Sequence, residues 1–389
     1  MAGKRSIFEE VAEGTASAPA PQGGMIAARG QGARGAIRVW LSILFLLVAT
    51  MIAVGGMTRL TDSGLSITEW KPVTGAIPPL DQATWEAEFA KYQAIPEYQL
   101  QNKGMTLDAF KHIYWWEWGH RQLGRLIGLV WAVGFFGFWV TSSIPPGWKG
   151  RLFGIGALGG LQGAIGWWMV SSGLTGTMLD VASYRLATHL GIAFVILGLI
   201  AWFVLSLSRS EAALMQARRG REAKLFSLST GLMHFAFLQI LLGALVAGID
   251  AGRAFPTWPD MNGQFFPADA FYVPDGQGGV LPVWHAFFEN PGLVQFMHRM
   301  SGYLLFAFGI VAWLRGRKSA HGATRAAFHA VMAMMVAQVC LGIWAVLTAA
   351  QVHVAITHQV GAVILWVLII RARHRAQYPI AGSIREGTA

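Results

Sequence analysis

The chain has 389 residues, of which 13% are charged and 54% belong to the hydrophobic set AVILMFWYC, and its formal net charge at pH 7 is +10. Soluble domains average about 25% charged residues, so this composition excludes an ordinary soluble protein and, over most of the length, a disordered one. It indicates an integral membrane protein. The single cysteine, Cys340, excludes an intrachain disulfide and haem attachment through a CxxCH motif.

Eight apolar stretches are long enough to cross a membrane as helices, which takes about 20 residues each. The predicted spans are 37–57, 117–141, 152–171, 185–207, 225–249, 295–314, 325–347 and 354–371. We therefore expect an all-α integral membrane protein with eight transmembrane helices.

The placement of basic residues predicts the orientation of these spans. If residues 1–36, the linker 208–224 and residues 372–389 lie in the cytoplasm, 20 of the 30 Lys and Arg residues lie on that side. This bias is typical of the positive-inside rule, so the basic charge indicates orientation and not nucleic-acid binding. We expect both termini in the cytoplasm and a flexible tail over residues 1–36, which are rich in Ala, Gly, Pro and Ser.

Two loops on the outer side, 58–116 and 250–294, are too long to be simple connections. Both contain Trp, Pro and Gly, and we expect them to fold over the outer surface. Within the first loop, Asp81–Tyr92 has a helix-like pattern. The two loops therefore predict a folded layer above the membrane.

The chain contains an internal repeat. The motif HRQLGR at His120–Arg125 returns as HRMSGY at His298–Tyr303, and the pair Thr188–His189 returns as Thr357–His358. Each copy has an even number of spans, so the copies share one orientation and are related by an axis along the membrane normal. We expect two pseudosymmetric four-helix bundles in parallel repeat, formed by residues 37–207 and 225–371.

Four histidines lie near the outer start of an even-numbered span: His120, His189, His298 and His358. Topology brings them to a similar depth, as one pair in each bundle. Two imidazoles on facing helices can bind a haem iron from both sides without a covalent link. Each pair lacks the further Cys or carboxylate ligands of a tetrahedral zinc site, which favours haem over a bare metal ion. The competing interpretation is four core histidines that hydrogen-bond across helices.

Arginines stand one to five residues from the candidate ligands, at the outer ends of the spans: Arg121, Arg125, Arg185 and Arg299. Guanidinium groups pair well with carboxylates, so these residues are candidate partners for the two haem propionates. Anchoring at the membrane boundary is the alternative interpretation.

Glu117 stands three residues before His120, so the two share one face of the predicted helix. The matching position before His298 is Gln295, and the acid is therefore present in one copy only. A carboxyl group at the membrane boundary is costly, which favours a functional role over that of an interfacial acid in water. We expect a reactive first bundle, in which Glu117 relays protons or orients water, and a fixed redox centre in the second.

These motifs resemble the haem A synthase family. The resemblance rests on WEWGHRQLGR, ATHLG, FMHRMSGY and THQVGA around the four histidines, and on GGMTRLTDSGLSITEWKPVTGAIPP after the first span. It covers nearly the whole chain apart from the two tails. It implies an eight-helix fold of two pseudosymmetric bundles and an oxidoreductase that converts haem O to haem A for a terminal cytochrome oxidase. In that reaction a porphyrin methyl group becomes a formyl group by successive hydroxylations that use dioxygen and electrons.

The resemblance also implies residue roles. His120 and His189 would bind the substrate haem, His298 and His358 would bind a resident haem B, and Glu117 matches the family's essential acid. Some bacterial members carry a Cys pair in an outer loop, and this chain has none, which excludes a disulfide-based electron route.

The expected setting is the bacterial cytoplasmic (inner) membrane, with the haem sites near the periplasmic face. Expected partners are haem O, dioxygen and an electron donor that stays open, with haem O synthase and cytochrome oxidase assembly factors as candidates. Self-association also stays open, as do the roles of Cys340, His112, His285 and His353.

The main competing function is a bis-His di-haem electron carrier of the quinol-linked cytochrome b type. It needs the same histidines but no acid on one side only, and it would hold haem B in both halves. A parallel-repeat transporter is disfavoured because the acids cluster outside the spans. A prenyl transferase is disfavoured because no aspartate-rich motif lies within or beside the spans. A bis-His iron has no vacant position for dioxygen, so ligand loss and an outer-sphere route both stay open.

Overall fold

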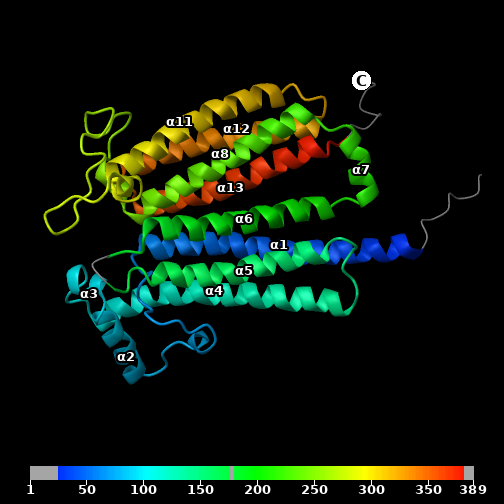
Figure 1. Cartoon of the computed structure of the whole chain (residues 1–389). Helices are drawn as coiled ribbons and strands as arrows, with labels where there is room; N and C mark the ends of the chain where they lie inside the picture. Colours follow the sequence, from blue (N-terminus) through cyan, green and yellow to red (C-terminus); the bar gives the residue numbers. More distant parts are fainter. Residues whose placement is uncertain (1–24, 176–178, 381–389) are drawn as a thin grey trace, which may run out of the picture.

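The computed structural model describes residues 25–175 and 179–380, with side chains from residue 33 onward. Within these ranges the chain is helical and forms no β-strand. Eight helices of 22 residues or more run alongside one another (Figure 1). They are α1 (Met25–Leu60), α4 (Leu107–Val140), α5 (Lys149–Val170), α6 (Ser183–Leu207), α8 (Ala223–Gly248), α11 (Pro291–Gly316), α12 (Gly322–Leu347) and α13 (Val352–Gln377).

Seven of these helices are long and apolar enough to cross a membrane, and α5 is not among them. The sequence of α5 contains seven glycines and begins with Lys149 and Arg151, which lowers its mean hydropathy. Each predicted span nevertheless falls on one long helix and overruns it by at most one residue, while several helices, above all α1, α4 and α13, are longer than predicted. The prediction of an all-α membrane protein is confirmed by these helices.

The predicted tails are shorter than expected where the structure describes them. Helix α1 already begins at Met25, so residues 25–36 are helical, and α13 continues to Gln377. Alanine, which recurs at the start of α1, has the highest helix propensity. Residues 1–24 and 381–389, which carry the rest of the predicted tails, lie outside the described residues. The linker 208–224 contains α7 (Glu211–Arg219), whose N-cap Ser210 accepts a hydrogen bond from the backbone N–H of Ala213 at 3.2 Å.

The long helices form two groups with the same order of neighbours. In the first half, α1 and α5 each pack against both α4 and α6. In the second half, α8 and α12 each pack against both α11 and α13. Figure 1 shows the two groups lying one above the other, with α6 of the first group facing α13 of the second at their boundary.

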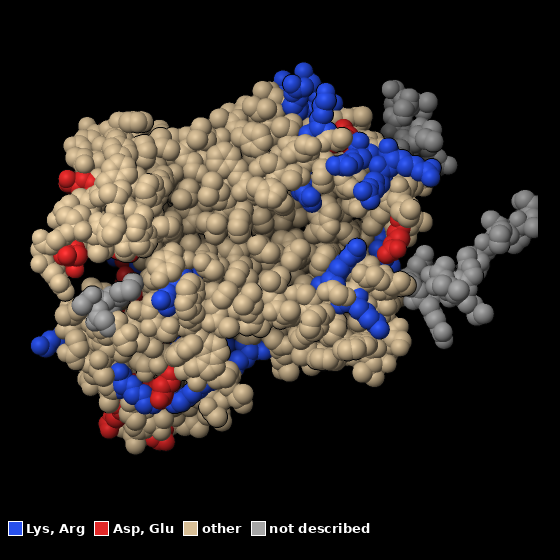
Figure 2. Space-filling model, in the orientation of Figure 1, with Lys and Arg blue, Asp and Glu red and all other residues tan. Residues whose placement is uncertain are grey.

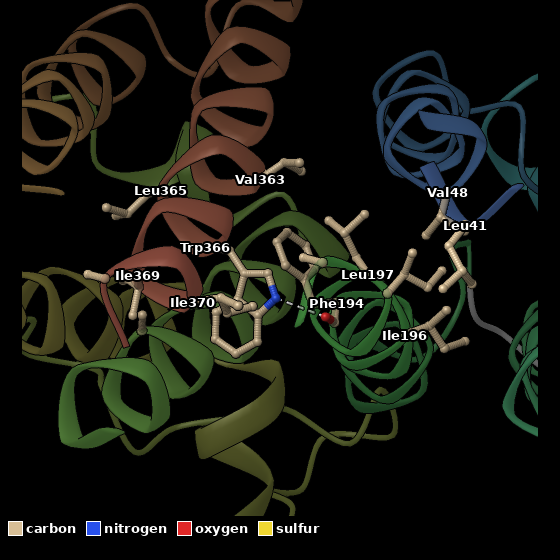
Figure 3. Packing of buried hydrophobic residues seen from close by; sticks show 14 of the residues in the cluster. Leu41, Val48, Phe194, Ile196, Leu197, Val363, Leu365, Trp366, Ile369 and Ile370 are labelled. Carbon is tan, nitrogen blue, oxygen red and sulfur yellow. Dashed lines mark hydrogen bonds between the residues drawn. The ribbon is translucent and has the colours of Figure 1, made fainter. Parts of the chain in front are cut away.

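The interface between the halves is an apolar core made mainly by α6, α8 and α13. The indole Nε1 of Trp366 donates to the carbonyl of Phe194 at 2.9 Å, which satisfies the polar atom of a buried tryptophan (Figure 3). A Cβ at Gly198 would lie 2.9 Å from the same Nε1, so a small residue lets α6 approach Trp366. The packing ties the halves into one body.

The long loops fold over one end of the helix bundle, which we call the loop end. The first contains η1 (Thr74–Ala76), α2 (Gln82–Gln93) and α3 (Pro96–Leu100), and the second contains α9 (Ala251–Ala254), η2 (Val283–His285) and α10 (Ala286–Glu289). The helix predicted over Asp81–Tyr92 is confirmed by α2: the side chain of its N-cap Asp81 accepts from the backbone N–H of Thr84 at 2.8 Å. Trp85 and Tyr114 pack edge to face at 5.0 Å and hold α2 against α4.

Charged side chains gather at the two ends of the molecule. Figure 2 shows blue Lys and Arg side chains at the end that carries α7, red and blue side chains among the loops, and a broad band of uncharged surface between them. This distribution fits a chain that spans a bilayer with its loop end on one side and α7 on the other.

Candidate functional site

The four candidate ligands lie on four different helices, at the loop end of each. His120 is on α4 and His189 on α6, while His298 is on α11 and His358 on α13. These helices all begin at the loop end, and each histidine lies within their first four turns. The structure therefore gives each half one pair of histidines at the loop end.

Each histidine ring packs against a glycine of the neighbouring helix. A Cβ added at Gly55 of α1 would lie 2.8 Å from Cε1 of His120, and one at Gly166 of α5 would lie 2.9 Å from Cε1 of His189. The second half repeats this arrangement on α8 and α12. There the distances are 3.1 Å for Gly243 with His298 and 3.2 Å for Gly342 with His358. We call Gly55, Gly166, Gly243 and Gly342 the ring-facing glycines.

The ring nitrogens lack the partners that packing histidines normally find. The Nδ1 atoms of His120, His189 and His358 are buried and accept or donate no hydrogen bond among the described residues. Nδ1 of His298 lies 3.1 Å from Nε2 of Gln239. A buried imidazole nitrogen without a partner is costly in a packing histidine, and it is available to a ligand that the protein chain itself does not supply. The donor set and the glycine-lined ring pockets therefore fit two bis-His haem sites.

A bare metal ion has less support within the described part of the chain. No group of three or more His, Cys, Asp or Glu side chains there is arranged to hold one. Haem differs because its porphyrin supplies four iron ligands and asks the protein for only the two axial ones.

Both carboxylate oxygens of Glu117, at the loop end of α4, accept hydrogen bonds. It is 3% exposed, and its Oε2 accepts from Ser66 Oγ and from the backbone N–H of Ile67, both at 2.7 Å. Its Oε1 accepts from Nε of Arg121 at 3.1 Å and from Nη2 at 2.5 Å. The acid thus joins α4 to the segment that follows α1, one turn from His120.

Arg121 completes this anchor, and Arg299 repeats it in the second half. Arg121 donates to the carbonyls of Ile67 and Glu69 at 2.7 and 2.9 Å. Arg299 donates to the carbonyls of Phe255 and Asp260, both at 2.8 Å.

The amide of Gln295 takes the place of Glu117 in this second anchor. Its Oε1 accepts from Nη2 of Arg299 at 3.3 Å, and its Nε2 faces the carbonyl of Phe255 at 3.4 Å. The two halves thus share one loop anchor with an acid in the first and an amide in the second.

The other two candidate arginines also have protein partners. Arg125 donates to the carbonyls of Lys71 and Pro72 at 2.8 Å. Arg185 donates to the carbonyl of Trp168 at 2.6 Å and stacks over its ring at 4.6 Å. These contacts hold loops and helix ends in place, and a propionate would have to share the same guanidinium groups.

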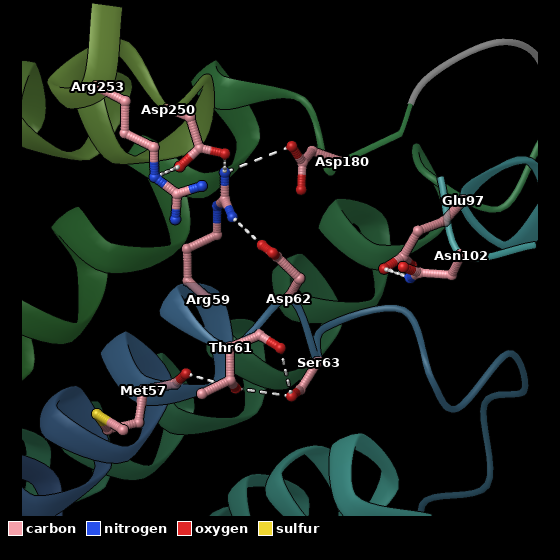
Figure 4. A network of polar contacts seen from close by, with 10 residues as sticks. All are labelled: Met57, Arg59, Thr61, Asp62, Ser63, Glu97, Asn102, Asp180, Asp250 and Arg253. Atoms are coloured by element: carbon pink, nitrogen blue, oxygen red, sulfur yellow. Dashed lines mark hydrogen bonds and ion pairs between the residues drawn. The ribbon is translucent and has the colours of Figure 1, made fainter. Parts of the chain in front are cut away.

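Arg59 is a polar centre that the sequence did not single out. It pairs with Asp62 at 2.9 Å, with Asp250 at 3.0 Å and with Asp180 at 3.4 Å (Figure 4). Asp62 and Asp250 follow the ring-facing glycines of α1 and α8 by the same seven residues, and both have a positive φ, at 48° and 51°. Burial raises the pKa of Asp180, while Arg59 opposes that rise. The cluster links the loop ends of both halves.

The remaining residues flagged by sequence lie away from the histidine pairs. His112 and His353 are exposed, and Nδ1 of His285 lies 3.1 Å from a carboxylate oxygen of Glu289. Cys340 is exposed on the surface of α12. None of these contacts brings them to a candidate ligand.

Comparison with known proteins agrees with this geometry. The model of the COX15-CtaA family, described as a cytochrome oxidase assembly protein, matches residues 38–370. The heme A synthase of Ruegeria sp. is 63% identical over 98% of this chain and 99% of its own length. That of Paracoccus denitrificans is 62% identical over 98% of both chains, and that of Cereibacter sphaeroides is 63% identical over 99% of both. The chain belongs to the haem A synthase family of cytochrome oxidase assembly proteins.

Proposed function

We propose that this chain is a haem A synthase: an oxidoreductase that converts haem O to haem A in the bacterial cytoplasmic membrane. The observation that carries the proposal is the pair of histidines at the loop end of each half, every ring packed on a glycine of the neighbouring helix. The full-length similarity to heme A synthases supports the same reaction. The methyl-to-formyl oxidation requires dioxygen, electrons and protons, so the site needs both a redox centre and a proton-handling group.

We assign the substrate haem to the first half and a resident haem B to the second. His120 and His189 would bind haem O, and His298 and His358 would bind haem B, each through a neutral imidazole. When bound, haem B supplies one-electron transfer toward the substrate. The apolar packing of α6, α8 and α13 keeps the two sites at a fixed separation.

Glu117 is the residue that distinguishes the reactive half. It lies three residues before His120 on α4 and is held by Ser66, Ile67 and Arg121. A carboxylate fixed in this way can orient a water molecule and can also pass a proton at Oε1 or Oε2, and the amide of Gln295 cannot pass a proton. Arg121 fixes the position of the carboxylate, and we propose that Arg121, Arg125, Arg185 and Arg299 also lie within reach of haem propionates.

We further propose that all eight long helices cross the membrane, as two pseudosymmetric bundles formed by residues 37–207 and 225–371. The repeated order of helix contacts supports this arrangement, and it includes α5 despite its glycines. The excess of Lys and Arg near α7 supports cytoplasmic termini and haem sites near the periplasmic face. Haem O synthase and oxidase assembly factors are proposed partners, with an electron donor of unassigned class.

A di-haem electron carrier is the second candidate, because both halves carry the same histidine and glycine pairs. Acid–acetone extraction of the purified protein, followed by chromatography and mass identification, separates the two functions. Haem B together with haem O, haem A or a hydroxylated intermediate is the expected result. Haem B alone from a host that makes haem O would favour the electron carrier, and a folded sample without haem would contradict both.

A further inference from the structure

Three of the four ring-facing glycines are preceded by a glutamine four residues earlier. These are Gln162 before Gly166, Gln239 before Gly243 and Gln338 before Gly342. Residues four apart lie on the same face of a helix, one turn from each other. Each glutamine therefore points toward the helix that carries the facing histidine.

Each glutamine binds the backbone of the histidine that its glycine faces. Nε2 of Gln162 donates to the carbonyl of His189 at 2.8 Å, and Nε2 of Gln338 donates to the carbonyl of His358 at 3.1 Å. Nε2 of Gln239 donates to the carbonyl of His298 at 3.0 Å. A hydrogen bond from one helix to the backbone of the next fixes their relative height and rotation where it forms.

The fourth pair lacks this bond, because the residue four before Gly55 is Met51. Met51 occupies the place of Gln239: its Cε lies 3.3 Å from a Cβ built at Gly124, and Nε2 of Gln239 lies 3.2 Å from one built at Gly302. Gly124 and Gly302 each follow their histidine by four residues. Among the described residues, no side chain donates to the carbonyl of His120.

Among the described residues, the turn of α4 that carries His120 has anchors on both sides but no side-chain hydrogen bond from a neighbouring helix at the histidine itself. Gln122 and Arg125, which follow it, donate to the loop carbonyls of Ala76, Lys71 and Pro72. Toward the loop end, Glu117 and Arg121 bind the segment after α1. Toward the other end, Nε1 of Trp40 donates to the carbonyl of Val130 at 2.9 Å. At the level of His120 the flexible thioether of Met51 stands in place of a directional bond from the neighbouring helix, so the contact of this turn with α1 is less fixed than the interhelical contacts at its three counterparts.

We propose that Gln162, Gln239 and Gln338 are positioning residues that hold three ligands on iron, and that Met51 makes His120 the ligand that withdraws from the substrate haem. The inference rests on the proposed function and deepens it. An iron bound by two histidines has no free coordination position. The structure assigns the release of one ligand, which would open such a position, to His120 on α4. Glu117 lies on the same helix. The two positions at which the first half departs from the repeat, Met51 and Glu117, therefore both adjoin one candidate ligand, His120.

Carbon monoxide tests this inference, because it binds a ferrous bis-His haem only after one histidine has left. CO affinity is measured spectroscopically on the reduced, haem-loaded full chain for the wild type and for Met51→Gln, Met51→Leu, Gln162→Met and Gln239→Met. Met51→Gln is expected to weaken CO binding about 3- to 10-fold, the effect of one interhelical hydrogen bond in a membrane. Met51→Leu, which adds no donor, is the matched control and should bind CO like the wild type.

The reciprocal changes should act in the opposite direction. Gln239→Met should make the haem of the second half bind CO, and Gln162→Met should strengthen CO binding in the first half by freeing His189. Unchanged CO affinity in Met51→Gln at full haem content would overturn the inference. If the Met51→Gln variant does not retain haem, the Gln239→Met variant provides the test. A haem in the second half that still does not bind CO in that variant would overturn the inference.

Haem extraction from the same samples keeps the two proposals apart. Absence of haem O, haem A and hydroxylated intermediates would contradict the proposed function. A normal haem content with CO affinities that do not follow the donor at position 51 contradicts only the role of Met51.

Discussion

The two halves of the molecule repeat each other down to single contacts and then diverge around one histidine. In the second half, His298 has a ring-facing glycine, a glutamine on its carbonyl and an amide, Gln295, in the loop anchor. In the first half, His120 keeps the glycine but has Met51 for the glutamine and Glu117 for the amide. A site that only stores an electron benefits from rigidity, whereas a site that oxidises its own haem needs a proton-handling group and room to move. The comparison teaches that the repeats differ at the two positions beside His120, and under the proposed function these differences mark the half in which the oxidation is proposed to occur.

Removing one ligand from each half gives the largest expected effect. His298→Ala should lose haem B, because loss of a ligand exceeds the roughly 10- to 100-fold cost of losing a group that merely supports one. His120→Ala should lose or loosen only the first-half haem. The measurement is haem content per protein by extraction, with circular dichroism as the control for folding. Full haem B occupancy in His298→Ala would break the assignment of the second half.

Replacing Glu117 by the amide that the second half carries at the matching position should have the next largest effect. Glu117→Gln should keep haem in both halves and lower conversion of haem O to haem A about 100-fold or more, because a general acid–base group contributes about that much. Gln295→Glu is the matched control and should leave conversion unchanged. The ratio of haem A to haem O in extracts reports both variants. Normal haem A output from Glu117→Gln would remove the proposed role of the acid.

Filling a ring pocket gives a smaller, graded effect. Gly166→Ala would bring a methyl group to 2.9 Å from the ring of His189, an overpacking that costs about 1–3 kcal/mol. It should lower the thermal stability and the haem content of the first half. Gly160→Ala on the same helix is the control, since a Cβ there would meet no atom of the described residues within 4 Å. Equal haem content in the two variants would show that the glycine does not position the ring.

Much of this architecture follows from the sequence because the membrane imposes simple rules. Apolar length and periodic motifs predict where the long helices and the four histidines lie. Local composition misleads at α1, where an Ala-rich stretch expected to be a tail is helical from Met25. At α5 the apolar span 152–171 is predicted and a long helix forms there, although its glycines lower the mean hydropathy. Whether those glycines face a ring depends on how helices rotate against each other.

The side-chain partners at the site could not be predicted in the same way. The anchors of Glu117 on Ser66 and Ile67 join residues about 50 positions apart. Arg59 meets Asp250 across 191 positions, and no local pattern encodes such a pairing. A signal for the glutamines was present in the spacing Gln-x3-Gly on three helices, and it becomes meaningful once their glycines are seen to face the rings.

The two long loops also differ in their buried polar groups: the first buries an acid and the second an amide. This difference supports the last prediction, which has the smallest expected effect. The second loop buries Asn290, whose amide donates to the carbonyls of Asp269 and Tyr272 at 2.7 and 2.9 Å. The first loop buries the acid Glu97, which is 3% exposed and whose Oε2 has no hydrogen-bond partner in the part of the chain that the structure describes. Burial, with the nearby charge of Asp180 and Asp62, raises the pKa of Glu97 to about 8.

The raised pKa predicts how the first loop responds to pH. The folded loop keeps the proton of Glu97 up to about pH 8, while the unfolded chain releases it near pH 4.5, so stability is greatest at low pH and falls between these values. The slope for one group is at most about 1.4 kcal/mol per pH unit. Glu97→Gln should flatten this decline and raise the melting temperature above pH 8, as followed by tryptophan fluorescence, whereas Glu86→Gln at an exposed site of α2 should not. If Glu97→Gln declines with pH as steeply as the wild type, the carboxyl group is already ionised in the folded loop, and the contrast with Asn290 has no energetic meaning.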